Sequence, residues 1–197
     1  APVASGALCD GSADFRLINE TFFSDHVYFE GAYELILFGG DTRRATEKLR
    51  DTFPNFPSGP LFAEIQLNDD RRLFDLTSTI HETDSYILFQ RLDRLYLAML
   101  PEWGSLRIGR QALTWGNGLI FNPMDMFNPF PPIAIDRDYK VGDDMAAAQV
   151  PVSEIGDLQA LYVPRRNPQT DNVEWDQSAL AGKLHVAAGT TEVDIMA

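Results

Sequence analysis

The sequence predicts an all-β fold in the form of an antiparallel transmembrane β-barrel, and three observations predict it. Apolar and polar residues alternate along several stretches, which is the period of a strand whose two faces meet different environments. These stretches approach the roughly ten residues with which a tilted strand crosses a bilayer. Short polar turns connect many of them, as expected for antiparallel neighbours. From this pattern we expect about eight or nine strands in the 197-residue chain.

The clearest alternation runs from Val27 to Phe38. Glu30 and Glu34 fall on one face of this stretch, and the opposite face carries no charge. A helix would distribute these two sets of residues around its circumference. The stretch is long for a strand of a small soluble sheet and suits one that crosses a membrane at a tilt.

Further strands are expected along the chain, each with an apolar and a polar face. Their ranges are Leu61–Leu67, Arg72–His81, Tyr86–Leu100, Ser105–Trp115, Leu180–Val186 and Glu192–Ile195.

Two stretches fit the strand pattern poorly, namely Phe15–Phe23 and Gln90–Arg94. Arg110 is a separate exception because it falls on the apolar face of its expected strand. Either a bulge at Gly109 turns Arg110 inward, or the residue lies near an aqueous interface.

Two segments are expected outside the strands. Residues 41–53 combine an N-cap candidate, Asp41 or Thr42, with good helix formers, which predicts a short loop helix. Residues 116–144 are rich in Asn-Pro and Pro-Pro pairs and also apolar, which predicts a long loop packed in the mouth or lumen of the barrel. We expect residues 1–13 to be a flexible N-terminal segment and 14–197 to be the N-terminal part of one barrel.

Composition and motifs argue against several other classes of protein. A net charge of −13 and a pI near 4.5 argue against nucleic-acid binding, which needs clustered Lys and Arg. No run of about 18 apolar residues is present, so we expect no transmembrane helix. The three histidines and the single cysteine, Cys9, form no ligand-spaced or catalytic motif. We therefore expect no enzymatic activity, no bound metal and no cofactor.

A resemblance to a known group of proteins begins at Leu106–Gly116, which reads LRIGRQALTWG. It continues into the Asn-Pro-rich stretch Phe121–Pro129 and covers Arg94–Asp144 most firmly. A strand of this kind followed by such a loop resembles proteobacterial outer-membrane barrels, including porin-like families and relatives of the alginate-export type. The resemblance implies a larger single-chain barrel in the bacterial outer membrane, with the loop folding toward the pore. It also implies lumen or loop-anchoring contacts for Arg107, Arg110 and Gln111.

The departure from this group is the number of strands, because its members usually have many more. The sequence also stops within an expected strand, at Asp194–Ala197. We therefore expect a fragment, a cleaved product or one part of a split barrel. An open sheet edge is not tolerated in lipid, so the rest of the barrel or a second chain must complete it.

The expected function is a pore for solutes or ions across the outer membrane, with no solute specified by the sequence. The acidic excess favours cations or neutral solutes. The candidate pore-lining residues are Glu30, Glu34, Asp75, Arg107, Arg110, Gln111, Lys183, His185, Glu192 and Asp194.

Two alternatives remain open at this point. The barrel could be a sheath that holds a partner such as an electron-transfer multihaem cytochrome, whose haems would belong to the partner because this chain has no CxxCH motif. The chain could instead be a soluble, secreted β-sandwich that acts as a binding module, which would explain the alternation without a membrane.

Overall fold

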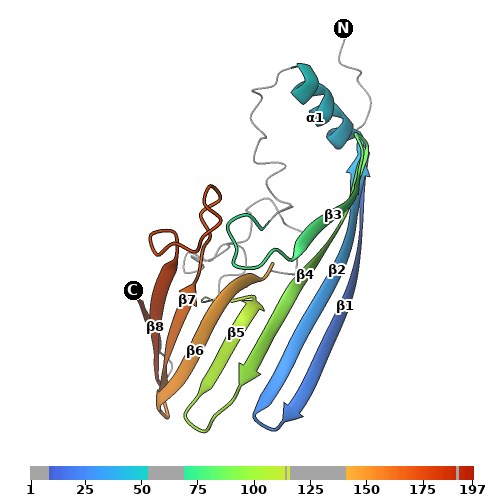
Figure 1. The fold of residues 1–197 in the computed structure, drawn as a ribbon. Coiled ribbons are helices and arrows are strands. Elements are labelled where there is room, and N and C mark those ends of the chain that lie inside the picture. The colour runs from blue at the N-terminus through green and yellow to red at the C-terminus, as the bar shows by residue number, and fades with distance from the viewer. Residues whose placement is uncertain (1–8, 53–68, 114, 116–140, 190) are drawn as a thin grey trace. The chain divides into compact units, whose positions relative to one another are not determined.

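The computed structural model describes residues 9–52, 69–113, 115, 141–189 and 191–197 (Figure 1). By its internal contacts the chain divides into two compact units. Unit 1 comprises Ala1–Leu17, Tyr33–Asn68 and Thr77–Arg91, and unit 2 comprises Ile18–Ala32, Asp69–Leu76 and Leu92–Ala197.

The described residues form nine strands and one helix. In chain order these are β1 (Asp10–Ser24), β2 (Val27–Gly40), α1 (Asp41–Thr52), β3 (Thr77–Glu82), β4 (Tyr86–Met99), β5 (Ser105–Gln111), β6 (Asp143–Ser153), β7 (Gly156–Val163), β8 (Ala179–Ala188) and β9 (Thr191–Met196). No helix in this part of the chain has both the length and the apolar character needed to cross a bilayer.

All nine strands belong to one sheet with the order β1-β2-β4-β5-β6-β7-β8-β9, and β3 pairs with β4 beside this path. The pairs from β3–β4 to β8–β9 are antiparallel. Except around β3, neighbours in the sheet are neighbours in sequence, as expected for consecutive hairpins. The all-β, antiparallel prediction is therefore confirmed. Over the described residues the path of pairing does not return from β9 to β1, so the sheet is not closed.

In unit 1, α1 begins where β2 ends, and the carboxylate of Asp10 caps its start. The backbone N–H of Thr42 donates to Oδ1 of Asp10 at 2.9 Å, which satisfies one of the free amides of the first turn. Arg43 then fixes the helix to the β3–β4 turn, because its guanidinium donates to the carbonyl of Thr83 at 3.0 Å and pairs with Glu82 at 2.6 Å. The loop helix expected at residues 41–53 is confirmed over Asp41–Thr52.

In unit 2, a hydrophobic core lies on one face of β6, β7 and β8. Small and large side chains lie together there with Trp115, which follows β5. The buried members are Trp115, Met145, Ala147, Leu161, Val163 and Ala181.

The strands expected at 27–38, 86–100, 180–186 and 192–195 are confirmed, and the one expected at 105–115 is confirmed over Ser105–Gln111. The strand expected at 72–81 is wrong in its first half, because residues 72–74 bend, residues 75–76 are not in a strand, and β3 begins at Thr77. The range 61–67 and residues 116–140 of the expected loop lie outside the described residues.

Other differences concern strands that the sequence did not reveal. Strands β6 and β7 were not predicted, and β6 takes up Asp143 and Asp144 from the end of the expected loop. Strand β1 covers the poorly alternating stretch at 15–23 and begins at Asp10, so residues 10–13 of the segment expected to be flexible belong to this strand.

Candidate functional site

The strand register of unit 2 divides the side chains of β4–β9 into two faces. Residues directly opposite each other in an antiparallel sheet point to the same side. Ile108 pairs with Leu97 and Ala146, Ala146 pairs with Tyr162, and Tyr162 pairs with Leu180. Counting along the strands from this row gives what we call the apolar face. Its members are Leu95, Leu97, Met99, Leu106, Ile108, Ala146, Ala148, Val150, Leu158, Ala160, Tyr162, Leu180, Gly182, Leu184, Val186, Val193 and Ile195.

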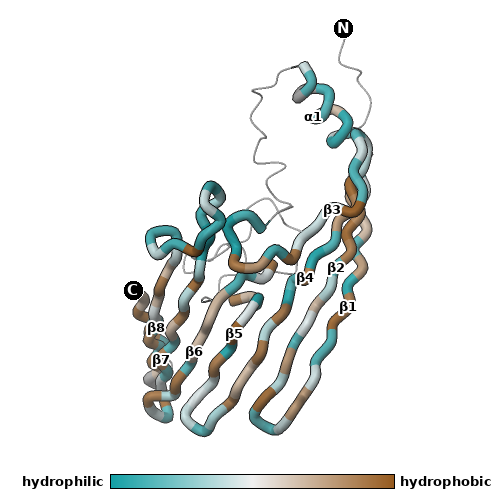
Figure 2. The backbone as a smooth tube through the Cα atoms, viewed as in Figure 1, coloured by the Kyte–Doolittle hydropathy of each residue, from teal (hydrophilic) through white to brown (hydrophobic). Residues whose placement is uncertain are grey.

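The apolar face is largely uncovered, and its charged residues in the strand register are Arg110 and Asp144, which are buried where β5 ends and β6 begins. Ile108 is 50% exposed, Leu180 68% and Ile195 61%. Figure 2 shows the underlying pattern as hydrophobic and hydrophilic positions that alternate along the strands. A contiguous exposed apolar surface across six strands is unusual for a soluble monomer and indicates contact with another apolar phase or partner.

The opposite side of the same strands, which we call the polar face, carries a hydrogen-bonded network. Gln149 and Gln159 both donate to Oδ1 of Asp157, at 3.0 and 2.8 Å. Asp194 accepts from two directions: its carboxylate lies 2.8 Å from Nδ1 of His185 and 3.3 Å from Nζ of Lys183. The pairing of β7 with β8 brings these two groups together, since Asp157 is the partner of His185 and Gln159 that of Lys183.

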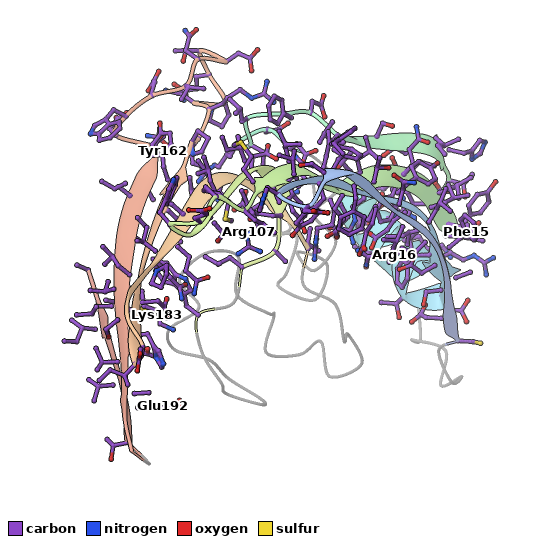
Figure 3. All side chains as sticks on the ribbon, turned by 90° about the horizontal axis from the view of Figure 1, so that it is seen from below. Phe15, Arg16, Arg107, Tyr162, Lys183 and Glu192 are labelled. Carbon is purple, nitrogen blue, oxygen red and sulfur yellow. The ribbon has the colours of Figure 1, made fainter. Side chains whose placement is uncertain are left out.

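Four of the predicted site residues therefore share one face of β8 and β9. His185 pairs with Asp194, and the partner of Glu192 is Ala187, two residues further along the same face. Lys183 is buried to 9% exposure, whereas Glu192 is exposed. Figure 3 shows Lys183 and Arg107 on the same side of the sheet in unit 2.

Arg107 lies on the polar face because its partners in the sheet are Ala98 and Ala147. It makes no ion pair with any described residue. Leu113 and Trp115 pack against the hydrophobic core on this same face. The chain thus lies over the polar face of unit 2 at the point where it enters residues 116–140.

Arg110 lies on the other face from Arg107, in register with Leu95 and Asp144. It does not face water, because only 1% of it is exposed and it pairs with Asp144. Gln111 shares the face of Arg107 and donates to the carbonyls of Arg107 and Met145, both at 3.3 Å. The three residues that the LRIGRQ motif brought together in sequence are thus divided between the two faces.

The remaining predicted residues lie in three different settings. In unit 2, Glu30 accepts a hydrogen bond from the hydroxyl of Tyr96. In unit 1, Glu34 is 1% exposed and pairs with Arg91 at 2.5 Å and Arg16 at 2.8 Å. Asp75 is exposed and lies before β3 rather than on a strand.

Sequence reasoning missed Gln149, Asp157 and Gln159 because it missed the strands that carry them. The only available signal was local: polar and apolar residues alternate from Asp157 to Ala160. Within the described residues no group of three or more metal-ligating side chains converges.

Comparisons with protein-family models, curated proteins and solved structures found no match to this chain.

Proposed function

We propose that this chain forms part of a β-barrel pore in the bacterial outer membrane. The observation that carries the proposal is the arrangement of unit 2, in which the apolar face is exposed along β4–β9 and the opposite face carries charged and amide side chains, while Arg110 and Asp144 on the apolar side are buried at one end of β5 and β6. A soluble protein would instead bury this apolar face, because leaving a leucine-sized side chain in water forgoes about 2 kcal/mol of burial free energy. In a transmembrane barrel the same alternation places apolar residues against lipid and polar residues in the lumen.

Strand length and sheet number support the same conclusion. Strand β6 has 11 residues and β8 has 10, while a tilted strand needs about 9–11 to cross a membrane. A β-sandwich packs two sheets face to face, whereas all nine strands here belong to one sheet. This difference favours the barrel over a soluble binding module.

The proposal requires further strands. Within the part of the chain that the structure describes, the open order from β1 to β9 leaves a free edge on each outer strand, and lipid offers no hydrogen bonds to unpaired backbone groups. Additional residues of a longer polypeptide, or a second chain, would pair with these edges. The polar face would then line an aqueous path in which Lys183, His185 and Asp194 set the local field for solutes.

The first test is the location and closure of the natural full-length protein. We expect it in the outer-membrane fraction, with a gel mobility in detergent that changes on boiling, followed by single-channel conductance in planar bilayers. Recovery as a soluble monomer with no heat-dependent shift would refute the proposal.

A second test uses cysteine labelling to measure the solvent accessibility of each face directly. In a Cys9→Ser background, single cysteines at Leu158 and Gln159 are neighbours on β7 that point to opposite faces. We expect a membrane-impermeant maleimide to label Gln159→Cys through the lumen and to leave Leu158→Cys unlabelled until detergent is added. Equal labelling at both positions in intact membranes would contradict the assignment of the faces.

A further inference from the structure

Two segments far apart in sequence meet at the ends of β5 and β6. One is residues 69–76, which precede β3, and the other is residues 164–178, which join β7 to β8. Arg166 connects them: its backbone N–H donates to the carbonyl of Arg71 at 3.1 Å, and its guanidinium donates to the carbonyl of Arg72 at 2.6 Å.

Charged side chains from both segments and both strands converge here in what we call the ionic cluster. Arg110 pairs with Asp144 at 2.8 Å and with Asp69 at 3.0 Å, and Asp69 also pairs with Arg72 at 2.8 Å. On the other face of the sheet, Arg165 donates to Oδ1 of Asp143 at 2.6 Å. The members of the cluster are Asp69, Arg72, Arg110, Asp143, Asp144 and Arg165, which are three acids and three arginines.

The same charges hold the backbone of residues 69–76. The N–H of Phe74 donates to Asp144 at 2.8 Å, and its carbonyl accepts from Arg110 at 2.7 Å. The N–H of Leu76 donates to Asp69 at 2.8 Å. These side chains therefore take the place that a neighbouring strand would have in a ladder, along a segment that is not itself a strand.

Because the ionic cluster is buried, the loss of any one member should destabilise the whole cluster. Asp69, Arg110 and Asp144 are each at most 2% exposed, so water cannot replace a lost partner. Removing one member of such a set leaves a buried charge without compensation, which is strongly destabilising, even though the intact set adds little net stability.

We propose that the ionic cluster is a lock that fixes residues 69–76 and 164–178 to the ends of β5 and β6 as one rigid rim. The lock goes beyond the proposed pore and stands without it. If the lock exists, residues 69–76 should detach from the ends of β5 and β6 only when the ionic cluster loses a charge.

Trypsin provides the test, because Arg71 is exposed within the locked segment and supplies a cleavage site there. In the full-length protein, Asp144→Asn should raise the rate of cleavage after Arg71 on the order of 100-fold, since cleavage follows the population of the opened segment. Asp75→Asn is the matched control, because Asp75 is an exposed acid of the same segment outside the cluster. Equal cleavage rates in the two variants would overturn the lock.

Hydrogen exchange on the unaltered protein covers the case in which Asp144→Asn fails to fold. The amides of Phe74 and Leu76 should exchange at least about tenfold more slowly than those of the exposed turn at Glu102–Trp103, which lies outside both locked segments. Exchange at the rate of that turn would overturn the proposal.

The consequence for conductance rests on the proposed pore. If the pore exists, Asp144→Asn should increase open-channel current noise and Asp75→Asn should not, whereas equal noise in both would contradict a locked rim. If the pore proposal fails but the lock holds, the protein will show protected amides and slow cleavage after Arg71 but will give no channel current.

Discussion

Asp69 shows how a single buried carboxylate responds to its partners. Burial would by itself raise the pKa of Asp69, but the charge of Arg110, the N–H of Leu76 and the charge of Arg72 outweigh burial and hold this pKa below its usual 3.8. The folded protein thus favours the ionised form of the Asp69 carboxylate. The sequence alone gave no sign of this role, because Asp69 stands in Asn68-Asp69-Asp70, a run typical of a turn.

The residue-scale prediction concerns acid stability. Because the folded pKa of Asp69 is lowered, its contribution is fully present above pH 3.8 and is lost as the pH falls below that value through the folded pKa. At pH 7 Asp69→Asn should lower the free energy of unfolding in detergent by about 3 kcal/mol. The difference from the unaltered protein should shrink below pH 3.8.

Urea titrations at several pH values would measure this difference, with the exposed neighbour variant Asp70→Asn as the control. A gap between Asp69→Asn and the unaltered protein that stays constant down to pH 2 would argue against the stabilising role of the ionised carboxylate.

At the scale of elements, Gly109 in β5 illustrates a position that only glycine fits. Its φ is +126°, and a Cβ built there would lie 2.2 Å from the carbonyl oxygen of Leu95 on β4. Gly182 in β8 is a matched contrast, because its Cβ would meet the nearest atom, the oxygen of Gln159, at an ordinary 3.7 Å. We expect Gly109→Ala to lower the free energy of unfolding by more than 2 kcal/mol and Gly182→Ala to change it by less than about 1 kcal/mol. Comparable midpoints in urea for the two variants would contradict the strained backbone at Gly109.

A second prediction at this scale distinguishes lipid from water on the apolar face. Leu158→Lys should destabilise the protein in lipid vesicles by about 2–4 kcal/mol, because a charge would then face hydrocarbon. Gln159→Lys, on the opposite face of the same strand, should cost less than about 1 kcal/mol. Urea unfolding in vesicles compares them, and a Leu158→Lys variant as stable as Gln159→Lys would mean that this face is solvated.

The same scale explains which elements the sequence reveals. Strands such as β2 and β8 could be predicted because large apolar and charged residues alternate along them, and this fixes both the strand and its faces. Strand β6 could not, since Asp143 and Asp144 are adjacent, Ala146–Ala148 place alanine on both faces, and Pro151 argues against a strand. The error at Arg72–Leu76 has the opposite cause: Phe74, Asp75 and Leu76 alternate, but the ionic cluster bends the chain and overrides the local pattern.

The candidate site also contains residues whose placement could be predicted from the sequence and residues whose placement could not. The grouping of Lys183, His185 and Asp194 could be read from two alternating stretches joined by a short turn. The faces of Arg107 and Arg110 also follow from their spacing, but the burial of Arg110 depends on Asp69, 41 residues earlier. Side chains that need such distant partners are beyond a pattern read along one strand.

At the scale of the whole molecule, the sequence carries an excess of negative charge, with 29 acidic and 16 basic residues. If the full-length protein conducts, acidic groups near the path attract cations. We expect the zero-current potential in a tenfold KCl gradient to have the sign of a cation-selective pore. A potential of the opposite sign would show that Arg107 and Lys183 dominate the path instead.

The order of the strands in the sheet also bears on how the protein assembles. From β4 to β9 each strand pairs with the one made immediately before it. Most of these steps close a short loop and add one row of hydrogen bonds, and the β5–β6 step must close the longer connection of residues 112–142. The growing edge then serves as the template for the next strand. The connection between β2 and β4 is longer still, because the chain must travel through α1 and residues 53–76 before that pair can form. We therefore expect the slow step of folding to be the union of the β1–β2 hairpin with β4, after which the remaining strands follow in the order of synthesis.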